Sequence, residues 1–254
     1  MKYVTMATCG VLVGLVLMMP CSGVALDDHG DKTRRQAAEP QNQPAAATAN
    51  LPVYVPPLRS APGGRVGGST RGARIMPMLT ALAPDHTGLT GEEQPTLFWY
   101  LAGTSPYPVE LTITDDRSPQ PLFKTRIVGP IQAGIQRIRL AETGVQLAKG
   151  VLYRWAVALV VDPAGPSRDN RAGGTIERVE SPKDLRAKLM QAGKAQTPSI
   201  YAQAGLWYDA LTAITDLLEA APNDPALRQQ QTSLLEQVGL RQIAEHNMRR
   251  SQAP

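Results

Sequence analysis

Alternating apolar and polar positions between residues 74 and 180 predict a series of short β-strands. Val109, Leu111 and Ile113 alternate with polar residues, which is typical of a strand with one buried face. Residues 97–101 form an apolar and aromatic run that predicts another strand. Turn-forming clusters such as Asp162-Pro163-Ala164-Gly165 separate these runs at the spacing of an all-β sandwich. A parallel α/β sheet is disfavoured because no segment of helical period lies between the strands.

The second half of this region contains an apolar run, residues 151–161, interrupted only by Arg154. A run that is apolar on both faces predicts a central strand packed on two sides. Its Trp155, together with Trp99, resembles the core aromatic residues of an immunoglobulin-like or fibronectin III-like antiparallel β-sandwich. We therefore expect residues 74–180 to form such a sandwich.

Past Ser181 the apolar period becomes helical and predicts a helical unit over residues 181–240. Leu211, Ile214 and Leu218 fall on one face of the middle helix, and Gly239 marks the end of the last one. Three pairs consist of a capping residue and a first-turn proline, and each predicts a helix start: Ser181-Pro182, Thr197-Pro198 and Asp224-Pro225.

The spacing of Ala210, Ile214 and Pro222 resembles the second helix of a tetratricopeptide repeat. One such unit cannot bury both of its faces alone, so it must pack on the sandwich or on a partner. Trp207 and Tyr208 are the candidate partner-binding residues. Residues 241–254 are expected to form a flexible tail, and the fold class is α+β.

The start of the chain predicts a cleaved signal peptide over residues 1–25. Lys2 is followed by 17 uncharged residues, from Val4 to Pro20, and Gly23 and Ala25 occupy the two small positions of a cleavage site. An uncleaved membrane anchor is one alternative, although the apolar run is at the short limit for a span. A lipoprotein modified at Cys21 is another, but Pro20 does not suit its cleavage.

Cleavage after Ala25 would remove both cysteines, Cys9 and Cys21, and leave a mature chain without thiol chemistry or disulfides. It would also remove one positive charge, so that the net charge of +4 becomes +3 over the remaining residues. This mild excess predicts no specific nucleic-acid partner.

Residues 26–50 are rich in Gln, Pro, Ala and Asn and predict a disordered linker. Residues 51–73 form a basic arm rich in glycine and proline. No acidic residue occurs between residues 40 and 84, which predicts an anion-binding site formed by four arginines: Arg59, Arg65, Arg71 and Arg74. The glycines match neither the dinucleotide nor the Walker spacing. The sequence favours over this site a flexible basic arm or an edge segment that wraps the sandwich.

Other residue patterns predict no catalytic residue, metal ligand or cofactor. His86 has no further ligand at a suitable spacing and is expected to form hydrogen bonds in a loop. The carboxylate pairs Glu92-Glu93 and Asp115-Asp116 lie among turn residues, where a solvated surface is favoured over a glycosidase pair. Asp209 is expected to support helix packing. No Gly-x-Ser-x-Gly motif of a serine hydrolase occurs.

Several stretches in order resemble a bacterial family known as domain of unknown function 928. They include Pro-Pro-Leu-Arg at residues 56–59 and Gly-Val-Leu-Tyr-Arg-Trp at residues 150–155, and the others are residues 82–86, 94–100, 204–211 and 234–240. The resemblance implies an exported protein and brings no activity, since the family has no established one.

We therefore expect an exported, periplasmic or secreted protein that acts as a non-enzymatic binding or scaffold module. An envelope protein or an anionic surface is the expected partner, with membrane contact only through an uncleaved signal segment. The alternative function is that of an envelope hydrolase whose carboxylates come together only in the fold.

The signal-peptide prediction is tested by amino-terminal sequencing of the exported protein. We expect the mature chain to begin at Leu26, because cleavage follows Ala25. A chain that begins at Met1 or at a lipid-modified Cys21 would contradict it.

Overall fold

The structure, a computed structural model, describes residues 51–57, 65–68, 76–115, 117–118, 120–161 and 170–252. All of these residues belong to one unit, residues 46–254. The strands are β1 (Val66–Gly68), β2 (Leu79–Ala81), β3 (Gly88–Thr90), β4 (Thr96–Leu101), β5 (Val109–Asp115), β6 (Phe123–Ile127), β7 (Gly134–Arg139), β8 (Leu152–Leu159) and β9 (Asn170–Arg178). The helices are α1 (Leu185–Gln191), α2 (Thr197–Gln203), α3 (Trp207–Ala220), α4 (Pro225–Gln237) and α5 (Arg241–Gln252). None of these helices is long and apolar enough to cross a membrane.

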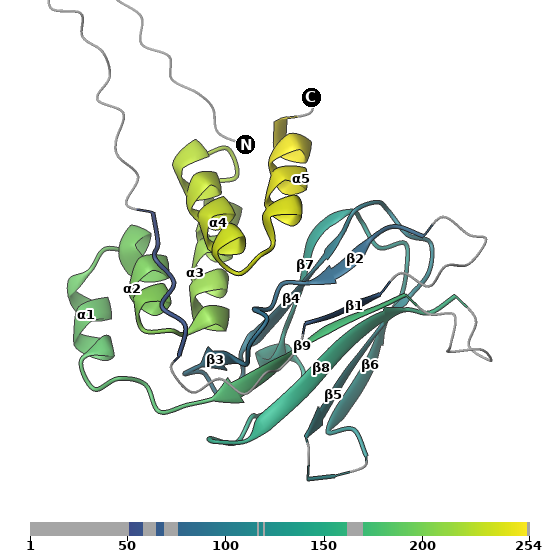
Figure 1. The fold of residues 1–254 in the computed structure, drawn as a ribbon, viewed down its shortest axis with the longest axis horizontal. Coiled ribbons are helices and arrows are strands. Elements are labelled where there is room, and N and C mark those ends of the chain that lie inside the picture. The colour runs from purple at the N-terminus through teal and green to yellow at the C-terminus, as the bar shows by residue number, and fades with distance from the viewer. Residues whose placement is uncertain are drawn as a thin grey trace, which may run out of the picture. The chain divides into compact units, whose positions relative to one another are not determined.

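The strands form two sheets, and the helices gather beside them (Figure 1). The larger sheet has the order β1-β9-β8-β5-β6, and the smaller has the order β2-β4-β7. The predicted α+β class is confirmed, but the sheets are not wholly antiparallel, because β3 pairs with β9 in parallel. This is possible since β1 and β3 share one edge of β9, where β1 covers residues 171–173 and β3 covers residues 176–178.

Strand positions agree with the alternation in the sequence. In β5, Val109, Leu111 and Ile113 are buried while the residues between them are partly exposed. The predicted strand at residues 97–101 is β4, and all six of its residues are buried. The central strand predicted within residues 151–161 is confirmed as β8, which lies between β9 and β5 in the larger sheet. Arg154, the one residue that interrupts the apolar run, is exposed, and residues 157–159 are buried.

The middle strand of the smaller sheet, β4, is buried on both faces. It pairs with β2 on one side and with β7 on the other, and α3 packs nearby. Trp99 of β4 and Trp155 of β8 both belong to one continuous apolar core, as expected for the two tryptophans.

The helix starts were predicted with mixed success. Asp224 caps α4 as expected, since its carboxylate accepts hydrogen bonds from the backbone N–H groups of Ala226 (2.8 Å) and Leu227 (3.3 Å). Gly239 follows this helix with a φ of +76°, a left-handed value that favours glycine. Thr197 is the first residue of α2 and not its cap. The start predicted at Ser181-Pro182 is wrong, because α1 begins later, after Asp184.

The predicted flexible tail is also wrong for its described part. Residues 241–252 form α5, in which Ile243 and Ala244 are buried in the common core. The apolar residues of this helix are few, so the sequence pattern alone did not separate it from a solvated tail.

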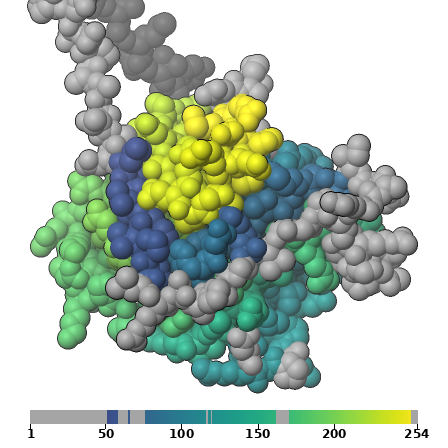
Figure 2. All heavy atoms as spheres, viewed as in Figure 1, coloured from purple at the N-terminus to yellow at the C-terminus, as the bar shows by residue number. Residues whose placement is uncertain are grey.

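Residues 51–57, which we assigned to the arm, run along the helices (Figure 2). The N–H group of Val55 donates to the carbonyl oxygen of Ala202 in α2 at 3.1 Å. The Gln237 amide of α4 accepts from the Tyr54 N–H group and donates to the Pro52 carbonyl oxygen, both at 2.8 Å. Tyr54 is buried, so this part of the arm is a component of the helical unit.

The start of α3 joins the helices to the sheets. The indole N–H of Trp207 donates to the Leu82 carbonyl oxygen at 3.0 Å. The Tyr208 hydroxyl accepts from the Trp155 indole N–H at 2.8 Å and donates to the Thr175 carbonyl oxygen at 2.9 Å. Because both side chains are fully buried, the helices and the sheets share one core.

The substitution Tyr208→Phe is predicted to destabilise the protein by about 1–3 kcal/mol, because it leaves the buried Trp155 indole N–H without an acceptor. The matched control is Tyr100→Phe, since the Tyr100 hydroxyl is equally buried but has no hydrogen-bond partner among the described residues. We expect that variant to be neutral or stabilising. Urea unfolding of the two variants measures the difference, and equal losses of stability would contradict the prediction.

Candidate functional site

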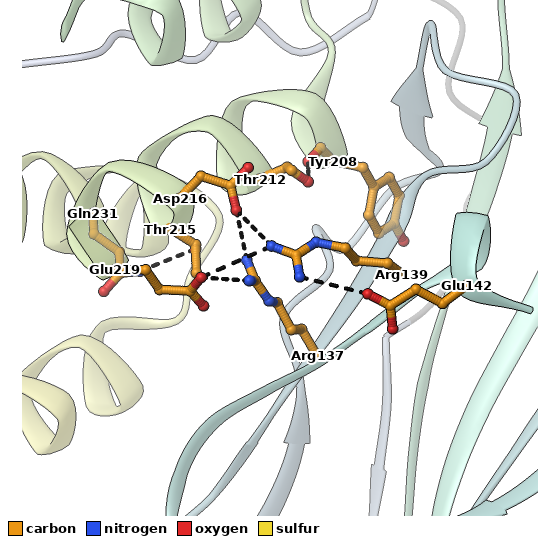
Figure 3. Close-up of polar contacts among 9 residues, drawn as sticks. All are labelled: Arg137, Arg139, Glu142, Tyr208, Thr212, Thr215, Asp216, Glu219 and Gln231. Atoms are coloured by element: carbon orange, nitrogen blue, oxygen red, sulfur yellow. Dashed lines mark hydrogen bonds and ion pairs between the residues drawn. The ribbon is translucent and has the colours of Figure 1, made fainter. Parts of the chain in front are cut away.

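An ion-pair network fixes the outer face of α3 on strand β7. Arg137 donates to Asp216 at 2.6 Å and also to Glu219, and Arg139 donates to Asp216 at 3.1 Å (Figure 3). Glu142, in the short 3-10 turn that follows β7, forms an ion pair with Arg139 at 3.6 Å. The two acidic residues are one turn apart on α3, so both reach the same pair of guanidinium groups. We call these five residues the arginine network.

A pocket of about 310 Å³ opens beside this network, between the loop that precedes β4 and helices α2 and α3. It collects three carboxyl groups, one phenol, three hydroxyl groups and one amide. We call it the carboxylate pocket, and its lining residues are Glu92, Gln94, Pro95, Thr96, Thr197, Tyr201, Asp209, Thr212, Ala213 and Asp216.

Asp209 is the deepest carboxyl group of the carboxylate pocket. It lies in the first turn of α3 and is only 5% exposed. One oxygen accepts from the Thr90 hydroxyl at 2.6 Å, and the other accepts from the Gly91 N–H group at 2.8 Å. Glycine at position 91 permits the close approach of Ser181, because a Cβ atom there would lie 2.4 Å from the Ser181 hydroxyl oxygen.

The pKa of Asp209 is raised to about 7, chiefly by burial. The nearby Glu92 acts in the same direction, whereas the bonds from Gly91 and Thr90 act to lower the pKa. Burial also raises the pKa of the Tyr201 phenol, and the charges of Asp209 and Glu92 act in the same direction. The charges of Asp209 and Glu92 therefore affect the pKa values of their neighbours in the pocket, although the three side chains come from separate parts of the chain.

The chemistry of the carboxylate pocket is that of hydrogen-bond recognition. Asp209 has both oxygens bonded within the protein, and Asp216 is held by Arg137 and Arg139. Glu92 is exposed at the mouth and forms no ion pair with the residues that the structure describes. Across the described ranges, no group of three or more His, Cys, Asp or Glu side chains is arranged to hold a metal ion.

The predicted anion site is only partly described. Arg59, Arg71 and Arg74 lie outside the described residues. Arg65 donates to the carbonyl oxygens of Ala83 (3.4 Å) and Val238 (3.3 Å) and forms an ion pair with Asp85 at 2.9 Å. Its guanidinium therefore joins the sheet region to the end of α4, and its charge is paired inside the protein.

The prediction that Trp207 and Tyr208 bind a partner is wrong, because both side chains are fully buried against the sheets. Helical periodicity does not distinguish an aromatic pair that faces a neighbouring sheet from one that faces another protein. The predicted packing role of Asp209 is confirmed by its bonds to Thr90 and Gly91.

His86 forms the expected loop hydrogen bond. Its Nε2 atom lies 2.9 Å from the hydroxyl oxygen of Tyr54, and the two rings stack with centroids 5.8 Å apart. Burial lowers the pKa of His86, while Asp85 raises it. This histidine thus helps to hold residues 51–57 in place.

The two carboxylate pairs from turns differ in their surroundings. Glu93 forms an ion pair with Arg178 at 3.4 Å, and Asp115 accepts from the Arg117 N–H group at 2.9 Å. Glu92 was predicted to be solvated and is exposed, but it also lines the carboxylate pocket. The sequence signal for this pocket was weak: an aspartate inside the apolar run of residues 206–211.

The substitution Asp209→Asn is predicted to remove a pH dependence of stability. The pKa of Asp209 in the folded protein, about 7, lies above the value near 3.9 of an unfolded aspartate, so the folded protein binds this proton more tightly. The stabilisation is complete below about pH 4 and is lost as the pH rises through about 7, by a few kcal/mol in total.

Urea unfolding from pH 4 to pH 8 tests this prediction. We expect the stability of the unchanged protein to fall relative to that of Asp209→Asn across this range. The variant Asp115→Asn, at a partly exposed carboxylate at the end of β5, serves as the control and should keep the wild-type slope. Parallel curves for the unchanged protein and Asp209→Asn would contradict the prediction.

Comparison with known proteins gives a family but no activity. No protein with a curated description matches the chain. The family model described as "Domain of Unknown Function (DUF928)" matches residues 66–248, which include all nine strands and the first four helices. This match covers well over half of the chain and agrees with the resemblance in the sequence, so the protein belongs to the domain of unknown function 928 family.

Proposed function

We propose that the protein is a non-enzymatic binding or scaffold module of the bacterial cell envelope, exported by its signal peptide. Its ligand in the carboxylate pocket is a neutral, hydroxyl-rich molecule such as an envelope glycan. In this proposal the sheets are an immunoglobulin-like or fibronectin III-like scaffold, and α2 and α3 correspond to a tetratricopeptide-like pair. An envelope protein or anionic surface remains the proposed partner of other faces.

The observation that carries the proposal is the fixed array of oxygen atoms in the carboxylate pocket. Carboxylate and amide oxygens accept hydrogen bonds from sugar hydroxyl groups, while threonine hydroxyls both donate and accept. The Tyr201 ring lies half-buried on one wall and offers an apolar surface for a sugar ring. The pocket is built on α2, α3, the start of β4 and the loop before β4, which carries Glu92 and Gln94.

The charges of the pocket favour a neutral ligand over a cation. Asp216 is neutralised by Arg137 and Arg139, and the raised pKa of Asp209 reduces its charge near neutral pH. Glu92 is the remaining acidic side chain among the residues that line the pocket, and it lies at the exposed mouth.

One observation supports the alternative of an envelope hydrolase. A buried carboxyl group with a raised pKa beside a second, exposed carboxylate is the arrangement of a general acid and its partner, here Asp209 and Glu92. Against this role, both oxygens of Asp209 are bonded to Thr90 and Gly91, and the side chain is almost fully buried. Such a carboxyl group is poorly placed to pass a proton to a substrate.

Calorimetric titration with oligosaccharides of N-acetylglucosamine tests the proposal. We expect saturable binding that Glu92→Gln weakens about tenfold, because a hydrogen bond to a charged group contributes about 1.5–3 kcal/mol. The matched control is Glu93→Gln, which alters a neighbouring exposed glutamate that does not line the pocket. Equal effects of the two substitutions, or no binding, would overturn the proposed glycan site.

The same oligosaccharides distinguish binding from hydrolysis. Under the binding proposal they are recovered intact after prolonged incubation. Release of shorter products by the unchanged protein, abolished in Asp209→Asn, would establish the hydrolase alternative instead.

A further inference from the structure

Three polar side chains meet on the other side of the arginine network, one from each of three helices. Thr215 of α3 is 8% exposed, and Gln231 of α4 is 4% exposed. Asn247 of α5 joins them and is partly exposed. They line a groove of about 450 Å³ that we call the amide groove, whose other lining residues are Ile135, Arg137, Leu218, Glu219, Pro222 and Arg228.

The hydrogen bonds at the floor of the amide groove run in one direction. The Asn247 amide donates to Gln231 Oε1 at 3.1 Å. Gln231 Nε2 in turn donates to the Thr215 hydroxyl oxygen at 3.4 Å (Figure 3). Thr215 is thus an acceptor, and its own hydroxyl hydrogen has no acceptor among the described residues. By contrast, Thr212 of the same helix donates to the Tyr208 carbonyl oxygen at 2.7 Å.

The floor of the amide groove therefore offers hydrogen-bond donors, the Thr215 hydroxyl and one Gln231 amide N–H, that form no hydrogen bond with the described residues. A buried hydroxyl hydrogen without an acceptor is costly, and so is a buried amide N–H. The Gln231 amide has two N–H bonds, of which the described hydrogen bonds use one, at the long distance of 3.4 Å. A ligand oxygen placed in the groove would accept from both Thr215 and Gln231.

The rim adds one positive charge to these donors. Arg137 is neutralised within the arginine network by Asp216 and Glu219. Arg228 donates to the Pro222 carbonyl oxygen and has no carboxylate partner in the part of the chain that the structure describes. One uncompensated guanidinium favours a ligand with a single negative charge.

The remaining wall is apolar. Ile135 and Leu218 are partly exposed, and Pro222 is exposed. A ligand that fills the groove therefore carries a short aliphatic group beside its charged end.

We propose that the amide groove binds an aliphatic monocarboxylate, whose oxygens accept from Thr215, Gln231 and Arg228 while its aliphatic part lies on Ile135 and Leu218. The ligand is either a free short-chain acid or the carboxylate end of a peptide with an aliphatic last residue. This site is separate from the carboxylate pocket and does not depend on the glycan proposal.

Isovalerate is the probe for this site, and the side-chain amide resonances of Gln231 and Asn247 are the readout in a ¹⁵N NMR titration of the full chain. We expect saturable shifts of both signals. Isovaleramide, which is neutral and has the same shape, should bind at least tenfold more weakly. Shifts that are equal for the two compounds, or that do not saturate, would overturn the proposal.

Two variants test the assigned contacts. Thr215→Val keeps the shape of the side chain but removes the hydroxyl donor, and we expect about tenfold weaker binding. Thr125→Val, on β6 and outside both pockets, is the matched control and should bind isovalerate as the unchanged protein does. Arg228→Gln, at the partly exposed rim, should also weaken binding and remove its dependence on salt. Unchanged affinity in both Thr215→Val and Arg228→Gln would contradict the site.

A second titration identifies the source of the carboxylate. A peptide ending in Gly-Leu with a free carboxylate is compared with its carboxy-terminal amide. Tighter binding of the free-acid peptide than of isovalerate assigns the groove to a chain end, and weaker binding assigns it to a free acid. If neither the peptide nor isovalerate binds, the carboxylate proposal fails, whatever the result with glycans.

Discussion

The first turn of α3 buries two adjacent aromatic side chains against the sheets, and their polar atoms must find partners there. Trp207 meets the Leu82 carbonyl oxygen, while the Tyr208 hydroxyl lies between Trp155 and the Thr175 carbonyl oxygen. An unpaired indole or hydroxyl group at this depth would cost free energy comparable to a lost hydrogen bond. These partners fix the rotation of α3 about its axis, and the arrangement of every residue farther along the helix follows.

The two pockets depend on that rotation. Asp209, one residue after Tyr208, points to the Thr90–Gly91 loop, and Asp216 and Glu219 meet the arginines of β7 farther along. The arginine network contributes to both pockets, since Asp216 lines the carboxylate pocket and Arg137 and Glu219 line the amide groove. The pockets differ in what they offer: mainly acceptor oxygens in one, and unused donors beside an uncompensated guanidinium in the other.

Strands and helix ends that depend on neighbouring residues could be predicted from local sequence patterns. Alternation located β5, a capping aspartate before a proline located the start of α4, and Gly239 located its end. The failures concern contacts between distant segments. Nothing near Tyr208 in the sequence specifies that its hydroxyl meets Trp155, and a polar α5 is stabilised by two buried residues whose partners lie on other elements. Likewise, Glu92, Tyr201 and Asp209 converge only after the sheets and helices have packed.

The docking of residues 51–57 on the helices has a mechanical consequence. Tension on the chain ahead of Leu51 would first reach α2 and α4, through the Val55–Ala202 bond and the two bonds of the Gln237 amide. It would then reach the Tyr54 ring, which stacks on His86. The same ring contacts Trp207 edge-on, with the ring centroids 5.2 Å apart. The Val55–Ala202 bond and the two Gln237 bonds all involve helices, and none involves a strand of the larger sheet. A pull from this end would therefore loosen the helices before it sheared the hydrogen bonds between β8 and β9.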